Sequence, residues 1–132
     1  METREQVLQL LKQELQFVES GGYRSAPRSP WRPRYIFEES PSCPNFGDRS
    51  RSTTCDECWL MEFVPVNLRP EQVPCRFVAL THDGVTVDSL YRHASVEESE
   101  EALRHWLESQ IRQIEAEVTA IRQQKAMKRL SA

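Results

Sequence analysis

The sequence has little glycine, no long hydrophobic run and no cysteine outside one short segment. Its four glycines, at positions 21, 22, 47 and 84, fall at predicted turns, which excludes a glycine-rich phosphate-binding loop. No apolar stretch approaches the roughly 18 residues that a transmembrane helix needs. The chain begins Met1-Glu-Thr-Arg, with an acid where a secretory signal peptide carries bases. These absences predict a cytoplasmic protein that makes no contact with membranes.

The charge balance and the apolar content limit further the class of protein that this can be. The chain carries 17 Lys and Arg against 20 Asp and Glu, a net charge of −3, which argues against a general nucleic-acid binder. Only 39% of its 132 residues are hydrophobic. That length suits one domain, and a core so lean is expected to need support from a metal or a partner.

All four cysteines lie within one 33-residue segment as Cys43-x11-Cys55-x2-Cys58-x16-Cys75. In a reducing compartment such a cluster binds metal or performs redox chemistry rather than forming structural disulfides. Four thiolates suit zinc or an iron–sulfur cluster, and a Cys-x2-Cys turn lets two sulfurs face one ion. The spacing therefore predicts a single tetrathiolate site with these four ligands.

Zinc is the favoured metal, because irregular four-cysteine sites are more often zinc sites. An iron–sulfur cluster is the alternative, and it would use a dry apolar shell. The Cys43-Pro44 step also occurs at some cluster ligands. The neighbouring residues that could form such a shell are Phe46, Trp59, Met61, Phe63 and Phe77.

Other uses of the cysteines are weaker. An active dithiol at Cys55-Asp-Glu-Cys58 would need nearby cations to lower its thiol pKa, and the two intervening acids act in the opposite direction. Four reduced thiols could instead be small core residues. His82, His93 and His105 stand apart in sequence from any nucleophile, so the sequence favours a non-catalytic protein.

Residues 1–20 predict an amphipathic helix. Thr3 and Gln6 fit a capping box at its start, and Gly21-Gly22 marks its end. Apolar residues recur three and four positions apart along one face, at Val7, Leu8, Leu11, Leu15 and Val18.

Residues 95–132 predict a longer helix, with Ser95 and Glu98 as its capping box. Its apolar stripe runs beyond what a small core needs, which indicates a coiled-coil-like seam. The partner of that seam is either the first helix or another chain, as a protein partner or a second copy. The stripe comprises Leu103, Leu107, Ile111, Ile114, Val118 and Ile121.

Between the helices, residues 21–94 begin with an extended strap set by prolines at 27, 30 and 33. Arginines interleaved with aromatic residues can contact nucleic acid. Pro-rich straps also bind proteins, which fits the acidic total better. The candidate partner-binding residues are Arg24, Arg28, Trp31, Arg32 and Arg34.

Residues 75–80 and 85–90 flank Asp83-Gly84, which predicts a β-hairpin, and residues 34–38 predict a third strand. The expected fold is thus α+β: a small metal-stapled core with a β-hairpin, an N-terminal amphipathic helix and a long C-terminal helix in one domain.

The expected function is a non-catalytic intracellular zinc-binding structural or interaction module, an accessory subunit or oligomer that uses its long helix. The alternatives are an iron–sulfur protein in electron transfer or a redox enzyme, and a nucleic-acid-contacting regulator.

Overall fold

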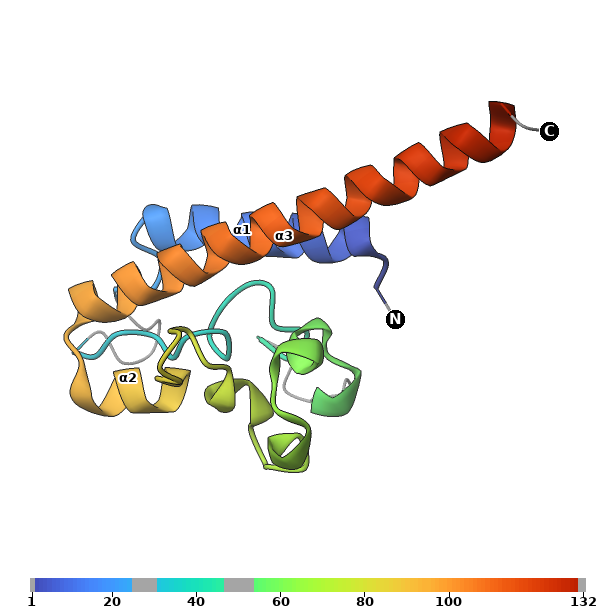
Figure 1. Ribbon diagram of the computed structural model, residues 1–132. Coiled ribbons are helices and arrows are strands. Elements are labelled where there is room, and N and C mark those ends of the chain that lie inside the picture. The colour runs from blue at the N-terminus through green and yellow to red at the C-terminus, as the bar shows by residue number, and fades with distance from the viewer. Residues whose placement is uncertain (1, 25–30, 47–53, 131–132) are drawn as a thin grey trace.

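The computed structural model describes residues 2–24, 31–46 and 54–130, which form two layers (Figure 1). In the first layer, helices α1 (Arg4–Glu19) and α3 (Val96–Leu130) run side by side in opposite directions. The second layer holds the irregular middle of the chain and the short helix α2 (Val87–His93). Four 3₁₀ turns lie within that layer: η1 (Cys55–Glu57), η2 (Trp59–Phe63), η3 (Val66–Leu68) and η4 (Pro74–Phe77).

Helix α1 begins and ends as its sequence predicts. The Gln6 amide donates to Thr3 Oγ1 at 3.2 Å, and the Thr3 amide donates to Gln6 Oε1 at 2.8 Å, which completes the capping box. After Ser20 the chain turns at Gly21, where φ is +80°, a conformation that favours glycine. A Cβ atom on Gly22 would lie 2.5 Å from the Phe17 ring, so this second glycine is required by packing.

Helix α3 starts at the predicted capping box, in which Ser95 and Glu98 exchange two hydrogen bonds of 3.1 Å. Ion pairs fix both ends of its contact with the first helix. Arg4 Nε lies 2.9 Å from Glu117 Oε2, and Arg24 Nη2 lies 2.8 Å from Glu100 Oε1. The apolar stripe is buried as far as Val118 and half-buried at Ile121, so the predicted seam forms within the chain. The last turns of α3 project past α1 (Figure 1).

The predicted α+β class is wrong, because the described residues contain no strand. Only one isolated antiparallel bridge, between Ala79 and Thr86, remains of the expected β-hairpin. The turn itself forms, with Gly84 at φ +85°. The second arm becomes α2 because Thr86 Oγ1 accepts a hydrogen bond of 3.1 Å from the Ser89 amide and caps the helix. Val87 and Leu90, three residues apart, then bury one helical face.

The third predicted strand is also absent, because residues 36–39 form a turn. Phe37 has φ +67°, which an extended chain does not allow. Its ring is 1% exposed, and its amide donates to Tyr23 Oη at 3.2 Å. Burial of this ring and the buried hydrogen bond offset the backbone strain.

Trp106 joins the two layers. Its ring lies edge-on to Phe37, with centroids 5.9 Å apart, and to Phe63, with centroids 5.1 Å apart. Phe63 ends η2, so the irregular layer packs directly against α3. Within the described residues, every helix is too short or too polar to cross a membrane.

Candidate metal centre

The fold brings the four cysteines of the predicted site to one cavity from three separate segments. Cys43 lies in a turn that follows the strap, Cys55 begins η1, Cys58 lies between η1 and η2, and Cys75 lies in η4. All four side chains line the same cavity beneath the helical layer, and all are thiols of intermediate exposure.

Short-range hydrogen bonds hold these segments in tight turns. The Cys58 amide donates to the Cys55 carbonyl at 3.1 Å, which closes the predicted Cys-x2-Cys turn. The Cys43 amide donates to the Ser40 carbonyl at 3.0 Å, and the Val78 amide donates to the Cys75 carbonyl at 3.3 Å. Each cysteine therefore sits on a backbone turn of fixed conformation rather than in an open loop.

The cavity is small and largely apolar. Its volume is about 30 Å³, which is space for about one or two water molecules. The other lining residues are Phe37, Pro44, Asn45, Thr54, Leu60, Met61, Val64 and Pro74.

The thiols line the cavity without converging on a point. Among the described residues, no group of three or more His, Cys, Asp or Glu side chains is arranged so that it could hold a metal ion. The type of donor thus fits a thiophilic metal, whereas binding would require the thiols to turn inward together.

Burial keeps two of the thiols protonated. Burial chiefly raises the pKa of Cys58, to about 11, and the nearby Cys43 and Cys55 thiols add to the effect. Burial also raises the pKa of Cys75, and the Glu38 carboxylate contributes. A redox nucleophile needs the opposite shift. These values therefore weigh against the active-dithiol interpretation.

A buried carboxylate anchors the turn that carries Cys43. Glu14, on α1, is only 1% exposed. It accepts hydrogen bonds from Tyr23 Oη at 2.5 Å and from the hydroxyls of Ser40 and Ser42. The Ser42 carbonyl in turn accepts from Trp59 Nε1 at 3.3 Å, beside Cys58. This network connects the helical layer to two of the cysteine segments.

Burial raises the pKa of Glu14 above its ordinary value of 4.5, although its three hydroxyl donors act in the opposite direction. A carboxyl that holds its proton longer in the folded state stabilises the fold at low pH. This contribution is lost as the pH rises through the folded-state pKa. We therefore expect Glu14→Gln to gain stability relative to the wild type as the pH rises from about 4 to about 8.

Urea denaturation of both proteins across this pH range measures the difference, and the other titrating groups cancel because both proteins share them. A stability difference that is constant with pH, or that shifts toward the wild type, would contradict the raised pKa.

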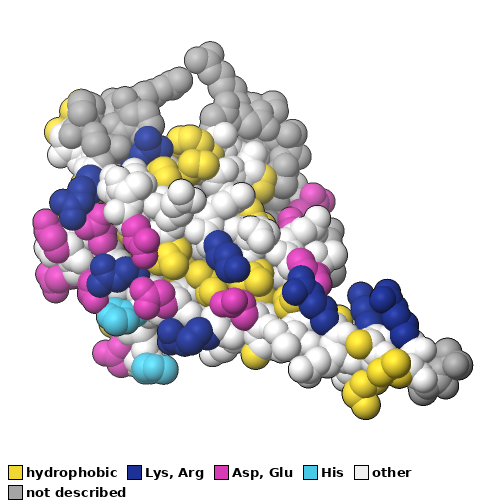
Figure 2. All heavy atoms as spheres, turned by 90° about the horizontal axis from the view of Figure 1, so that it is seen from above, with side chains coloured by type: hydrophobic (Ala, Val, Ile, Leu, Met, Phe, Trp, Pro, Cys, Tyr) yellow, Lys and Arg dark blue, Asp and Glu magenta, His cyan; other side chains and the backbone are white. Residues whose placement is uncertain are grey.

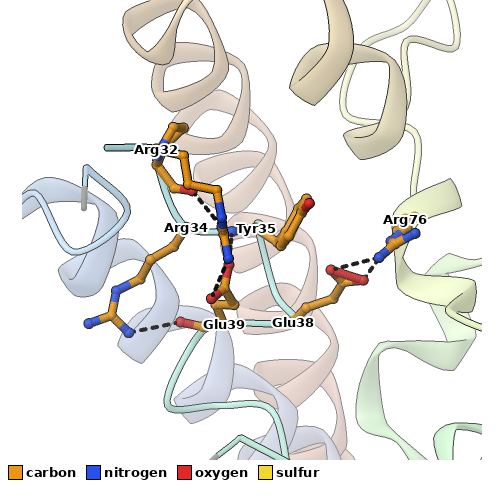
Figure 3. Close-up of polar contacts among 7 residues, drawn as sticks. Arg32, Arg34, Tyr35, Glu38, Glu39 and Arg76 are labelled. Carbon is orange, nitrogen blue, oxygen red and sulfur yellow. Dashed lines mark hydrogen bonds and ion pairs between the residues drawn. The ribbon is translucent and has the colours of Figure 1, made fainter. Parts of the chain in front are cut away.

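Three of the predicted partner-binding arginines, Arg24, Arg32 and Arg34, make contacts within the chain, and Figure 3 shows those of Arg32 and Arg34. Arg32 Nη1 lies 2.7 Å from Glu39 Oε1, and its guanidinium stacks on the Tyr35 ring at 4.6 Å. Arg34 Nη1 donates to the Glu39 carbonyl at 3.1 Å. Arg24 pairs with Glu100, as described above.

Of the other two candidates, Trp31 is 81% exposed, and Arg28 lies outside the described residues. A further arginine that sequence reasoning did not place here, Arg76, lies 2.5 Å from Glu38 (Figure 3). In the described part of the strap, Arg32 pairs with Glu39 and Arg24 pairs with Glu100 of α3, and these pairs reduce the positive charge that the strap offers to a polyanion.

We expect the protein to pass through a single-stranded DNA or RNA resin at low salt without retention, because its total charge is negative and the described strap arginines, Arg24, Arg32 and Arg34, make contacts within the chain. Elution against a salt gradient measures this, with a basic protein of similar mass as the positive control. Retention that falls steadily with increasing salt would restore the nucleic-acid alternative.

Comparison with known proteins gives no external guide to this centre. No protein-family model matches the chain, and no curated protein or solved structure matches it significantly. Function is therefore argued from the chain's own residues.

Proposed function

We propose that this chain is a non-catalytic zinc-binding module whose metal braces a platform for protein contact through α3. One observation carries the proposal: cysteines from three segments, with no other cysteine in the chain, line one small cavity. Four thiols that line one cavity support metal binding, because thiolates are soft donors that suit zinc.

The bracing role is supported by what the cysteine segments contact. Within the described residues, the layer that contains them has only 3₁₀ turns and α2 as regular structure, so its backbone hydrogen bonds are mostly local to single turns. The same layer holds Phe37 and Phe63 against Trp106 of α3. An ion shared by the four thiols would fix these turns relative to one another and so fix the aromatic contacts beneath α3.

Zinc is favoured over an iron–sulfur cluster because irregular four-cysteine sites are more often zinc sites. Zinc needs only the four thiolates, whereas a cluster must also accommodate bridging sulfides and several irons. A reducing compartment such as the cytoplasm would keep the four thiols available.

The contact role falls to α3 because its last turns extend beyond the body (Figure 1). Two large apolar side chains are exposed at this end, Met127 at 68% and Leu130 at 87%, and a protein that bound there would remove them from water.

The deciding experiment is to purify the untagged protein anaerobically and to measure its metal content together with its visible absorption spectrum. We expect about one zinc per chain and no visible band, because Zn²⁺ has a filled d shell. Detection of iron and sulfide together with a broad visible band would identify an iron–sulfur cluster in place of zinc. Metal-free protein that stays folded and takes up no added zinc would overturn the proposal.

A further inference from the structure

The buried stripe of α3 continues past the body of the molecule, but its residues change from apolar to basic. Steps of three and four residues carry the stripe from Ile121 to Lys125 and then to Arg129. At about 100° per residue, Lys125 lies at the angular position of Leu107, and Arg129 lies at that of Ile111. Leu107 and Ile111 are 0% and 8% exposed. Cations therefore occupy the side of α3 that packs against the body nearer the start of the helix.

Helix α1 does not reach these cations. It begins at Arg4, which pairs with Glu117 at 2.9 Å, whereas α3 runs on to Leu130. Residues 122–130 are all exposed, and this end projects beyond α1 (Figure 1). The projecting end is about 13 Å long, or about two and a half turns. Within the described residues, the line that α1 follows along α3 is thus uncovered past residue 121.

Three cations at this end have no ion-pair partner among the described residues. Glu117 is the last acid in the sequence, and residues 118–130 carry a charge of +4. No described carboxylate pairs with Arg122, Lys125 or Arg129. These three residues follow one another at spacings of three and four, so they repel each other along one side of the helix. Figure 2 shows Lys and Arg side chains gathered at the projecting end.

The helix dipole accounts for only part of this positive charge. Nearer the start of α3, the cation Arg104 lies between Glu101 and Glu108 and pairs with both. The dipole favours cations only within the last turn, which contains Arg129 but not Arg122. The cations before the last turn can therefore gain an ion pair only from a carboxylate that the described chain does not supply.

We propose that this end of α3 binds an acidic helix of another protein, which lies along α3 beyond the start of α1. The inference rests on the part of the proposed function that assigns protein contact to α3, and it names the chemistry of that partner. It does not require zinc. Arg122, Lys125 and Arg129 are each about one turn apart, so carboxylates three or four residues apart on the partner helix can each meet one cation. The partner would extend the two-helix layer in line with α1.

The charge of the rest of the molecule favours a short acidic helix over an extended polyanion. The whole chain carries −3 and residues 118–130 carry +4, which leaves −7 on the remainder. The projecting end is about 13 Å long, little more than the screening length of about 8 to 10 Å in 0.1 to 0.15 M salt. A nucleic acid or an anionic bilayer would therefore also meet repulsion from the acidic body. A membrane-surface helix also needs a broad apolar face, and the large apolar side chains after Ile121 are only Met127 and Leu130.

A charge-swap experiment with synthetic peptides tests the proposal. The probe is a fluorescently labelled amphipathic helical peptide with glutamates three and four residues apart on one side, and matched peptides carry glutamine or lysine at the same positions. Fluorescence anisotropy, with the full chain as titrant, measures each dissociation constant. We expect the wild type to bind the glutamate peptide about tenfold or more tightly than the glutamine peptide, with an affinity that falls as salt rises. The triple variant Arg122→Glu/Lys125→Glu/Arg129→Glu should lose the glutamate peptide and bind the lysine peptide instead.

The matched pair of single variants is Lys125→Glu and Lys12→Glu. Both change the net charge equally, but Lys12 lies on the exposed side of α1, within the body of the molecule. Lys125→Glu should weaken binding of the glutamate peptide about fivefold or more, because it replaces an attraction by a repulsion. Lys12→Glu should leave the dissociation constant within about twofold of the wild type.

The proposal would be overturned by a wild type that binds the glutamate peptide no better than the glutamine peptide, or by equal losses in the two single variants. It would also be overturned if single-stranded DNA, or vesicles of phosphatidylcholine with about 30% phosphatidylserine, bound more tightly than the glutamate peptide through the same cations. Zinc content, measured on the same samples, should be equal in all variants. A failure of this contact is thereby distinguished from a failure of the metal site.

Discussion

Replacing Cys58 with serine is expected to release the metal and to unfold much of the protein. Cys58 connects η1 to η2 and lines the cavity with the three other thiols. A hydroxyl is a poor zinc ligand, so three thiolates would remain, and a structural zinc site contributes on the order of 10 kcal/mol to folding. That is comparable to the whole stability of a typical domain. Metal analysis and thermal unfolding by circular dichroism measure the two effects.

Met61→Leu is the matched control, because Met61 lines the same cavity and the exchange conserves volume. It should keep its metal and lose less than about 1.5 kcal/mol of stability. Chelation of the wild type should reproduce the Cys58→Ser unfolding curve. Near-normal thermal stability in Cys58→Ser would show that the metal is absent or has no structural role.

Glu14→Ala is expected to have the second largest effect, a loss of about 3 to 5 kcal/mol in the free energy of unfolding. The substitution removes the acceptor shared by Tyr23, Ser40 and Ser42. These hydroxyls would stay buried with fewer partners, and such unsatisfied groups cost more than the hydrogen bond was worth. Because Ser40 also bonds the Cys43 amide through its carbonyl, zinc affinity should fall as well. Urea denaturation and a zinc titration measure both effects.

The control is Glu19→Ala, which removes an exposed carboxylate from the same helix. It should change stability by no more than about 0.5 kcal/mol. The loss of stability in Glu14→Gln should lie between those of Glu14→Ala and Glu19→Ala, because the glutamine amide can still accept one hydrogen bond and donate others. If Glu14→Ala cost no more than Glu19→Ala, the network would not anchor the Cys43 turn.

Both long helices are predictable from the sequence because their signals are local. Thr3 with Gln6 and Ser95 with Glu98 are capping pairs three residues apart, and both form as predicted. The stripe from Leu103 to Val118 is buried for the same reason, since helical spacing alone places these residues on one face. Whether it would pair within or between chains depended on tertiary packing, which periodicity does not encode.

The β-hairpin prediction failed where two local signals competed. Val85 to Leu90 has strand-like residues after an Asp-Gly turn, but Thr86 is also three residues before Ser89 and can cap a helix. The cap and the burial of Leu90 against the core outweighed β propensity, which depends strongly on context.

Glu14 shows a signal that was present but missed. It lies three residues after Leu11 and four before Val18, on the buried face of α1. A charged residue inside an apolar stripe is predictable as a buried polar group, because helical geometry leaves it no route to solvent. Its partners, in contrast, come from residues up to 28 positions away and required the folded structure.

The positions of the three tryptophans give the unmodified protein an optical reporter of its metal state. Trp59 is 4% exposed, follows Cys58 directly and donates to the Ser42 carbonyl one residue before Cys43. Its indole emission should therefore respond when the thiols turn inward onto an ion. Trp106, 8% exposed, would respond to separation of the two layers, and Trp31, 81% exposed, contributes a red-shifted background that Trp31→Phe would remove. Fluorescence of the unlabelled chain can thus follow metal loading and layer docking in one titration.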